Sequence, residues 1–549
     1  MDFFFNQPQQ VVDQILGSLA QLAPLTLADP GSGMRILVRS DWRQQQVAII
    51  SGGGAGHEPS HAGFVGAGML TAAVSGELFA SPSVAAVLAA IRHCRGPAGT
   101  LLVVKNYTGD RLNFGLAVEQ ARREGLDARM VIVADDIALP DAPQPRGIAG
   151  TVLMHKYVGY LAEQGRSLNE MVTRAEQFAG RLMSLGMALS SCTLPGHAIE
   201  RRSPELGLGI HNEPGAQQVQ PKDAAEAVAI VLAPLLEQAA KRYGADARLI
   251  VLLNNLGGCS SQELAVLTHE ILSQIGVQRV ALMVRPAALM TSLDMHGFSI
   301  SLLPAEADYL EALSVPVEAP AWPGVYRPHS LETFAVPADT ADEIDPGTRD
   351  VAVEAAILRI TQALQNARQA LDELDARSGD GDTGSTFAAG ALAVEQKLQA
   401  GMLSSGEPAR LCDEVGRLLA RAMGGSSGVL LSILFTATGT ALAIPRGLPA
   451  VAGKSWREAL NDGIARMQHY GGAKPGDRTM LDALIPAIDA LDQGLRAAAQ
   501  AARKGAEYTA TLTRAHAGRA SYVPAHALAG VVDPGAEAVA QVFEALSSG

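Results

Sequence analysis

Cysteine is scarce in this chain, and no two cysteines lie close together. The 549 residues include only Cys94, Cys192, Cys259 and Cys412. This wide spacing argues against a disulfide scaffold or a zinc site and suits a reducing cytoplasm, where we expect the protein to reside. The first residues, MDFFFNQPQQ, also lack the basic segment and the long apolar core of a secretion signal.

Charged residues are few as well, at 18%, whereas hydrophobic residues make up 48% and the mean hydropathy is +0.14. This balance excludes a disordered chain and predicts large buried cores, and the length predicts two or three domains. A net charge of −13 disfavours nucleic acid or an anionic membrane as a partner, since either would require a basic face.

Long hydrophobic runs are also missing. The longest apolar stretch, VLLSILFTATGTALAI from Val429 to Ile444, is short and is broken by serine and threonine. It predicts a buried helix and not a membrane span.

The character of the sequence changes near residue 330. Before it, short runs rich in valine and isoleucine alternate with helical patterns, which predicts an α/β domain over residues 1–330. The predicted strands are 46–50, 100–104, 129–133, 248–253 and 279–284. Asparagine and glycine follow a strand in both VVKNYTGD and LLNNLGG, so we expect two related α/β halves.

A stretch rich in proline and acidic residues predicts a linker over residues 331–348. Beyond it, residues 349–549 have helical patterns almost throughout, which predicts an all-α domain. One apolar stripe with spacings of four and three residues predicts a helix of about seven turns. Its members are Val353, Ile357, Ile360, Leu364, Ala367, Leu371 and Leu374.

Three aspartates, Asp375, Asp380 and Asp382, lie among small residues where this helix ends. Magnesium prefers oxygen ligands and is typically held by a few carboxylates together with substrate phosphates. The glycines between the aspartates allow a sharp turn and a close approach of phosphate. This pattern predicts a magnesium site for phosphoryl transfer from ATP, and the alternative is that DGDTG forms an ordinary surface turn.

Other loops of the predicted helical domain favour the nucleotide interpretation. MGGSSG at 423–428 opens an apolar helix and offers backbone N–H groups and hydroxyls to phosphate. GGAKPGDRTMLD, GRASYV and DPGA add polar loops that contain Arg478 and Arg519. Because the sequence contains no Walker A or kinase-type glycine motif, a nucleotide site here must belong to a different family.

Three glycine-framed polar loops mark the first domain. IISGGGAGHEPSHAG and VVKNYTGDRLNFG each follow a predicted strand, and GLGIHNEPG places His211 between a glycine run and a Pro-Gly turn. Ligands of open α/β sheets bind where strands end and loops begin, so we expect the loops around His57 and Asp110 to share one pocket. The alternative is that each histidine only packs or hydrogen-bonds locally.

Taken together, these motifs resemble the ATP-dependent dihydroxyacetone kinases, in that family's order and over nearly the whole chain. The resemblance implies an N-terminal α/β substrate domain and a C-terminal eight-helix antiparallel barrel that carries ATP and two Mg²⁺ ions. It implies that His211 forms a covalent hemiaminal with the ketone and that His57 and Asp110 handle the proton of the attacking hydroxyl.

The resemblance also implies the remaining contacts. Gly54, Ala55, Gly56 and Lys105, with His57 and Asp110, would line the substrate pocket, and Asp375, Asp380 and Asp382 would bind the metal. The expected nucleotide contacts are Thr383, Gly384, Ser385, Thr386, Ser426, Ser427, Gly471, Met480, Arg519, Asp533, Pro534 and Gly535. The expected partners are a small ketose and ATP, with a second copy of the chain in a homodimer.

Two residues depart from the family pattern, because Ala55 stands where serine is common and Asn212 where glycine is common. Both would lie beside the substrate, so erythrulose or another short sugar could be the acceptor in place of dihydroxyacetone. The same motifs also allow a phosphocarrier that keeps ADP bound, a side activity that cleaves FAD to a cyclic flavin phosphate, and a non-catalytic sugar-sensing regulator.

Overall fold

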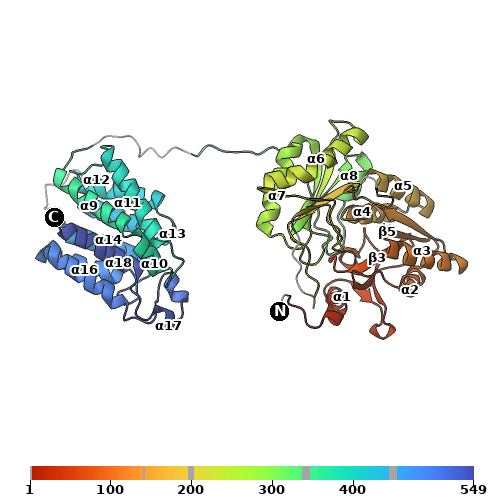
Figure 1. Ribbon diagram of the computed structural model, residues 1–549, viewed down its shortest axis with the longest axis horizontal. Coiled ribbons are helices and arrows are strands. Elements are labelled where there is room, and N and C mark those ends of the chain that lie inside the picture. Colours follow the sequence, from red (N-terminus) through yellow and green to blue (C-terminus); the bar gives the residue numbers. More distant parts are fainter. Residues whose placement is uncertain (1–2, 140–141, 196–202, 337–346, 444–453, 549) are drawn as a thin grey trace. The chain divides into compact units, whose positions relative to one another are not determined.

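The structure is a computed structural model that describes residues 3–139, 142–195, 203–336, 347–443 and 454–548. The chain divides into two compact units, Met1–Phe334 and Ala335–Gly549 (Figure 1). The division falls inside the stretch predicted as a linker, 331–348, of which residues 337–346 lie outside the described residues. The N-terminal unit is mixed α/β and the C-terminal unit is helical, which confirms the predicted fold class.

The N-terminal unit contains a six-stranded sheet and a seven-stranded sheet. In the first sheet the order is β1-β2-β4-β3-β5-β6, and β4, β3, β5 and β6 run parallel to one another. Its strands are β1 (Leu25–Leu27), β2 (Arg35–Arg39), β3 (Ala48–Ala55), β4 (Ala72–Leu78), β5 (Thr100–Lys105) and β6 (Ala128–Val133).

The second sheet has the order β13-β11-β10-β12-β7-β8-β9, and β10 and β11 form its parallel pair. Its strands are β7 (Met183–Ala188), β8 (Glu205–Leu206), β9 (Gln217–Gln218), β10 (Leu249–Asn255), β11 (Val280–Ala288), β12 (Gly297–Pro304) and β13 (Val325–Tyr326).

Helices cover these sheets in layers. Apolar residues of α2 and α3 pack on one face of the first sheet, and those of α6 and α7 pack on one face of the second. The largest core joins the other faces of both sheets through α1, α4, α5 and α8. The helices are α1 (Val11–Leu22), α2 (Val84–Cys94), α3 (Thr108–Arg123), α4 (Gly150–Glu163), α5 (Leu168–Arg181), α6 (Ala224–Tyr243), α7 (Ser261–Ile275) and α8 (Ala307–Ser314).

The glycine run at the end of β3 differs from its predicted secondary structure. We predicted a loop from Gly52 onward, but Gly52, Gly53 and Gly54 continue the strand, in which Gly52 and Gly53 pair with β4. A side chain on Gly52 would bring its Cβ to 2.1 Å from the Val74 carbonyl oxygen. Glycine therefore allows the two strands to approach closely, and the turn begins only at Gly56, where φ is +96°.

The helices of the C-terminal unit form a closed ring. Successive contacts run α9–α11–α12–α13–α14–α15–α16–α18, and α18 contacts α9 again, which gives eight ring members among the described residues. The helices are α9 (Val351–Asn366), α10 (Arg368–Asp375), α11 (Thr383–Gln399), α12 (Pro408–Ala422), α13 (Gly425–Leu442), α14 (Trp456–Gly471), α15 (Leu481–Asp489), α16 (Leu495–Thr509), α17 (Ala525–Leu528) and α18 (Pro534–Ser547).

The seven-turn helix predicted from the apolar stripe is interrupted at Ala367, where α9 ends and α10 begins. The break coincides with a close contact to α11, because a Cβ on Gly384 would lie 1.9 Å from the Arg368 carbonyl oxygen. The apolar stripe continues across the break, since Leu364 and Leu371 both lie in the core of this unit.

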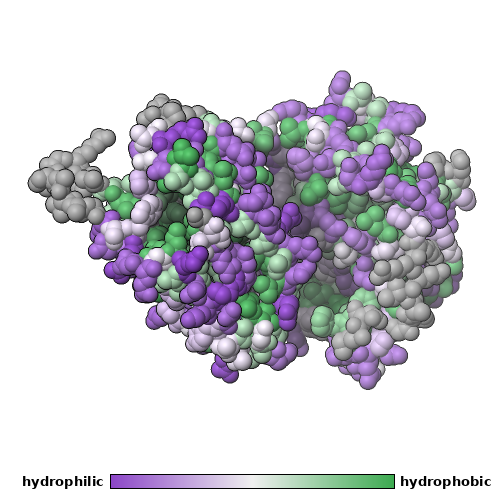
Figure 2. All heavy atoms as spheres, turned by 60° about the vertical axis from the view of Figure 1, so that its left-hand side comes forward, coloured by the Kyte–Doolittle hydropathy of each residue, from purple (hydrophilic) through white to green (hydrophobic). Residues whose placement is uncertain are grey.

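The apolar stretch from Val429 forms most of α13, and its last residue, Ile444, lies outside the described residues. Among the described helices, α13 is long and apolar enough to cross a membrane by length and composition alone. It lies between α12 and α14, but only 22% of its apolar window is fully buried, so it is less buried than predicted. Figure 2 shows hydrophilic residues over much of the visible surface, with smaller apolar areas between them.

Candidate functional site

Aromatic rings surround His211 in the N-terminal unit. The ring centroid of His211 lies 4.7 Å from that of His57 and 4.4 Å from that of Tyr107. Phe79 lies beside both histidines, at 5.2 Å from His57 and 5.6 Å from His211. Four segments distant in sequence therefore meet around the predicted nucleophile.

His57 is held in one tautomer. Its Nδ1 lies 2.8 Å from the Thr291 carbonyl oxygen, which can only accept, so Nδ1 carries the proton and donates. Its Nε2 is buried and has no hydrogen-bond partner among the described residues. Burial, reinforced by the charge of Lys105, holds the pKa of His57 well below 6.5. The structure therefore presents a neutral imidazole with a free lone pair on Nε2.

Glu213 orients His211 in the same way. The His211 backbone N–H donates to Glu213 Oε2 at 2.9 Å, and His211 Nδ1 lies 3.3 Å from Glu213 Oε1. Burial would raise the pKa of Glu213, but the hydrogen bonds from His211 outweigh it and hold the pKa at about 2. An ionised carboxylate only accepts, so Nδ1 of His211 is the donor and Nε2 is left free to act as a nucleophile.

Lys105 and Asp110 approach this region from β5 and the first turn of α3. A Cβ on Gly53 would lie 3.5 Å from both Lys105 Nζ and Asp110 Oδ2. Lys105 is fully buried, which lowers its pKa, although Asp110 and other carboxylates oppose the shift. Lys105 Nζ and the Tyr107 hydroxyl have no hydrogen-bond partner among the described residues, so a polar ligand can satisfy them.

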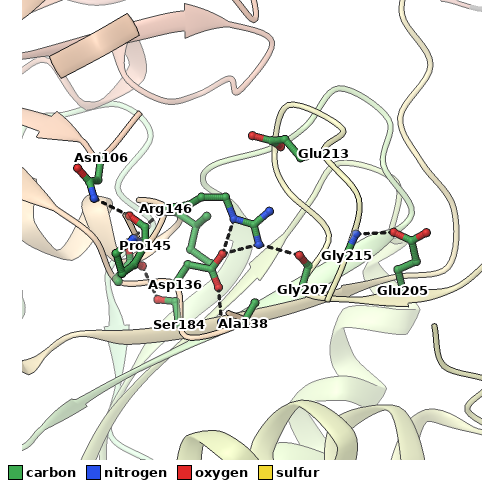
Figure 3. A network of polar contacts seen from close by, with 12 residues as sticks. Asn106, Asp136, Ala138, Pro145, Arg146, Ser184, Glu205, Gly207, Glu213 and Gly215 are labelled. Carbon is green, nitrogen blue, oxygen red and sulfur yellow. Dashed lines mark hydrogen bonds and ion pairs between the residues drawn. The ribbon is translucent and has the colours of Figure 1, made fainter. Parts of the chain in front are cut away.

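The loop that carries His211 is clamped at both ends (Figure 3). Arg146 pairs with Asp136 at 2.7 Å and donates to the Gly207 carbonyl oxygen, also at 2.7 Å. At the other end, the Gly215 N–H donates to Glu205 at 2.6 Å. These contacts fix the loop before any ligand binds, which favours a preorganised site.

The predicted substrate residues on β3 make close backbone contacts. A Cβ on Gly54 would lie 2.6 Å from the Ala80 backbone nitrogen, and a Cβ on Gly56 would lie 2.7 Å from the Phe79 ring. Ala55 is buried and pairs with Leu78 of β4. The glycines therefore bring the end of β3 against the segment that carries Phe79.

In the C-terminal unit, a cleft gathers most of the predicted metal and nucleotide residues. Those lining it are Asp375, Asp380, Asp382, Thr383, Thr386, Ser426, Ser427, Gly471, Met480, Arg519, Asp533, Pro534 and Gly535. Gly384 and Ser385 do not line it, because they face α10 on the opposite side of the first turn of α11. Ser385 instead donates from its backbone N–H and its hydroxyl to Asp372, both at 2.8 Å.

Carboxylate oxygens of the three predicted metal ligands lie within 4.8 Å of one another. Asp375 is buried, and its Oδ2 accepts from the backbone N–H groups of Gly381, Asp382 and Thr383 at 3.0–3.1 Å. Its Oδ1 remains available, and a Cβ on Gly379 would lie only 2.2 Å from it. This acidic, oxygen-only donor set fits magnesium. Arg519 forms an ion pair with Asp380.

Among the described helices, the N-termini of α11, α13, α15 and α18 reach the same cleft. Helix N-termini favour anions because their backbone N–H groups are unpaired and the helix dipole is positive there. Asp533 caps α18 by accepting from the Ala536 N–H at 2.9 Å, and burial raises the pKa of Asp533 to about 6.

Sequence reasoning assigned no contact to several residues of these sites. Arg478 lines the cleft, is 1% exposed, and has two guanidinium nitrogens without a partner among the described residues. Its only sequence signal was its place in a glycine-rich loop. Glu213 lies two residues after His211 inside the motif GLGIHNEPG, whereas Phe79 and Thr291 gave no signal because they come from distant segments.

Comparison with known proteins agrees with this arrangement. Residues 20–321 match the Dak1 domain and residues 377–548 match the DAK2 domain. The chain is 45% identical to the dihydroxyacetone kinase of Citrobacter freundii over 99% of both chains. It is 38% identical to the triokinase/FMN cyclase of Homo sapiens over 96% of both.

Solved structures show the same relationship. The C. freundii dihydroxyacetone kinase in complex with AMP-PNP and Mg²⁺ matches with a TM-score of 0.77 and 43% identity, over 100% of this chain and 99% of that one. This chain therefore belongs to the dihydroxyacetone kinase family.

Proposed function

We propose that this protein transfers the γ-phosphate of ATP to a hydroxyl of dihydroxyacetone or a similarly short ketose, which gives the ketose phosphate and ADP. One observation carries the proposal. The ring centroids of His57 and His211 lie 4.7 Å apart. In each ring a hydrogen bond engages Nδ1, which leaves Nε2 available to react with the substrate. Membership of the dihydroxyacetone kinase family supports the same activity.

His211 captures the ketone as a covalent hemiaminal. The Nε2 lone pair forms a bond to the carbonyl carbon, the C=O π bond opens, and the carbonyl oxygen takes a proton as the Nδ1 proton is released. Positive charge develops on the imidazole during the attack, and the ionised Glu213 beside Nδ1 stabilises it. Because a polyol has no carbonyl, this step selects ketoses and aldoses over glycerol.

His57 serves as the general base for the phosphoryl step. Its neutral Nε2 accepts the proton of the attacking hydroxyl, and its depressed pKa keeps it neutral at physiological pH. Asp110, buried at the start of α3, orients the same hydroxyl. Lys105 supplies a buried cation that can donate to a substrate oxygen.

The cleft of the C-terminal unit holds the nucleotide. Asp375, Asp380 and Asp382 would hold Mg²⁺, which, when bound, would neutralise the charge of the phosphates. The N-termini of α11, α13 and α18 and the unpaired guanidinium nitrogens of Arg478 stabilise the remaining phosphate charge. We further propose a cytoplasmic homodimer, as the family resemblance implies.

A flavin side activity is a second candidate, because the human relative is described as a triokinase/FMN cyclase. It uses the same nucleotide cleft, and incubation with FAD and Mn²⁺ followed by chromatography of the flavin products tests it. If the protein were instead a phosphocarrier that keeps ADP bound, free ATP alone would support no turnover. If the protein were a non-catalytic regulator, it would show no turnover, and the aspartate cluster would have no catalytic role.

A substrate panel tests the proposal. The purified full-length protein is incubated with ATP, Mg²⁺ and dihydroxyacetone, erythrulose, glyceraldehyde or glycerol, and ADP release is measured. We expect turnover with the carbonyl compounds, highest with a short ketose, and none with glycerol. Equal turnover with glycerol contradicts covalent capture, and no turnover with any acceptor contradicts the kinase itself.

A further inference from the structure

Cys259, Glu263 and His296 form a cluster in the N-terminal unit that has no part in the proposed reaction. One ligand atom from each, the cysteine sulfur, a carboxylate oxygen and an imidazole nitrogen, lie within 4.8 Å of one another. All three residues are partly exposed, so the cluster is open to solvent ions.

Two glycines bring the elements of this cluster together. A Cβ on Gly257 would lie 1.8 Å from the Leu293 carbonyl oxygen, and one on Gly258 would lie 2.8 Å from the His296 Cα atom. The Gly258 N–H also donates to the Met295 carbonyl oxygen at 2.9 Å. The turn after β10 therefore presses against the segment before β12, which places Cys259 beside His296.

Hydrogen bonds also hold Cys259 and Glu263 in position. Asn255 binds the Cys259 backbone on both sides, since it accepts from the N–H at 3.1 Å and donates to the carbonyl oxygen at 2.8 Å. Glu263 caps α7, and its Oε2 accepts from the N–H and the hydroxyl of Ser260 at 2.7 and 2.8 Å. Its Oε1 is directed at His296 Nε2, at 2.6 Å.

We propose that Cys259, Glu263 and His296 form a binding site for a zinc-type divalent metal ion. Thiolate, imidazole and carboxylate are the three ligand types that zinc takes in proteins, and three protein ligands leave one position for water. Zinc–ligand bonds of about 2.0–2.3 Å require the ligand atoms to lie closer together than 4.8 Å. Small movements of the three side chains would bring their ligand atoms to that spacing. The contacts of Ser260 with Glu263 and of Asn255 with Cys259 supply the outer hydrogen bonds that fix metal ligands.

This donor set differs from the aspartates of the C-terminal unit. Magnesium prefers oxygen ligands, whereas the sulfur and nitrogen of Cys259 and His296 favour zinc or cobalt. The wide cysteine spacing argued against zinc in sequence, but a site with one cysteine requires no cysteine pair.

The cluster also adjoins the loop that orients the proposed catalytic histidines. Residues 291–295 connect it to the Thr291 carbonyl oxygen, which binds His57, and to Ser292, whose hydroxyl donates to the Ile210 carbonyl oxygen at 2.7 Å. A bound ion would fix one end of this loop.

Cobalt titration tests the site, since a thiolate ligand gives Co²⁺ a charge-transfer absorption band in the near ultraviolet. The metal-free full-length protein is titrated with Co²⁺ in excess Mg²⁺, so that the aspartate cluster stays occupied. We expect one equivalent of Co²⁺ to produce the band and Zn²⁺ to abolish it by displacement.

Variants identify the ligands. Cys259→Ala should lose the band, whereas Cys412→Ala, which removes a buried cysteine of the other unit, should keep it. Glu263→Gln retains an oxygen that can cap α7, and both it and His296→Gln should weaken binding at least about tenfold, since even outer contacts contribute about 10–100-fold. Absence of the band in the native protein, or its persistence in Cys259→Ala, overturns the proposal, and His296→Gln tests it should Cys259→Ala not fold.

Discussion

At the scale of single residues, the arrangement around His211 decides the proposed chemistry. The tautomers of His57 and His211 are fixed, because Nδ1 of each donates a hydrogen bond, to a carbonyl oxygen in His57 and to an ionised carboxylate in His211. Both Nε2 atoms are therefore left as lone-pair donors. In the proposed reaction, one imidazole acts as a nucleophile toward carbon and the other as a base toward a hydroxyl proton.

His211→Ala tests the nucleophile. The covalent adduct with dihydroxyacetone, seen as added mass on the intact protein, should disappear because the variant lacks the proposed nucleophile, Nε2 of His211. ATP binding, which belongs to the C-terminal unit, should stay within about twofold of native. An adduct of native abundance in this variant contradicts the assignment.

Glu213→Gln tests the orientation of His211. A charge-assisted hydrogen bond contributes about 1.5–3 kcal/mol when buried, and Glu213 is partly exposed, so we expect the lower end, about a tenfold loss of adduct. Glutamine retains an acceptor for the His211 backbone, which preserves the loop. The control is Glu237→Gln on the exposed face of α6. Unchanged adduct formation and KM in Glu213→Gln would show that Glu213 does not position the nucleophile.

At the scale of elements, the ends of helices and strands supply the sites. The aspartate loop lies between α10 and α11, and the Oδ2 atom of Asp375 is engaged by three backbone N–H groups, which leaves Oδ1 for a cation. Asp380 and Asp382 are exposed, and Asp380 also pairs with Arg519. In the proposed metal site, the buried Asp375 fixes the loop and the exposed pair completes the set of ligands.

Asp380→Asn should slow ATP turnover by at least about 10–100-fold, because a ligand counts for more than the outer contacts that give this range. The hemiaminal adduct should form as in the native protein, since the substrate residues lie in the other unit. Steady-state kinetics over a range of Mg²⁺ concentrations and intact mass measure the two effects. Turnover close to native at low Mg²⁺ would show that Asp380 is not a metal ligand.

Much of this element structure was predictable from sequence, and the exceptions have physical causes. The Val- and Ile-rich runs located β3, β5, β6, β10 and β11. Strands β4 and β7, with the sequences AAVSGEL and MSLGMA, lacked that signal because small residues replace branched ones where neighbouring backbones lie close. The end of β3 was misjudged as a loop for the same reason.

The candidate sites divide along similar lines. Residues inside contiguous motifs, such as His57, His211 and the three aspartates, could be identified from spacing. Phe79 and Thr291 could not, since the His57–Thr291 contact joins residues 234 positions apart. Gly384 and Ser385 lie within a motif but face away from the cleft. Successive residues of a helical turn point in different directions, so only some residues of the motif can face the cleft.

At the scale of the whole molecule, each unit carries one half of the proposed reaction. The N-terminal unit holds the carbonyl site with its buried histidines, and the C-terminal unit holds the acidic cleft. Buried histidines also couple the stability of the N-terminal unit to pH. His57, His61 and His155 are fully buried, and burial, assisted by Lys105, lowers all three pKa values, that of His155 to about 3.

The N-terminal unit should therefore lose stability on acidification. Below about pH 6.5 the unfolded chain binds protons that the folded unit excludes, so each histidine contributes up to roughly 1.4 kcal/mol of destabilisation per pH unit. This stability is fully present above pH 6.5 and is lost as the pH falls toward the folded pKa values. Thermal unfolding between pH 7.5 and 5 measures it, and a midpoint for this unit that is independent of pH contradicts the burial of neutral imidazoles.

In the proposed reaction, the two units together move phosphate from ATP to a captured ketose. Phosphorus NMR of the purified full-length protein with ATP, Mg²⁺ and dihydroxyacetone follows this transfer directly. We predict that the γ-phosphate signal is replaced, mole for mole, by that of a sugar phosphomonoester together with ADP. Persistence of ATP, or its conversion to ADP and inorganic phosphate alone, would contradict the account.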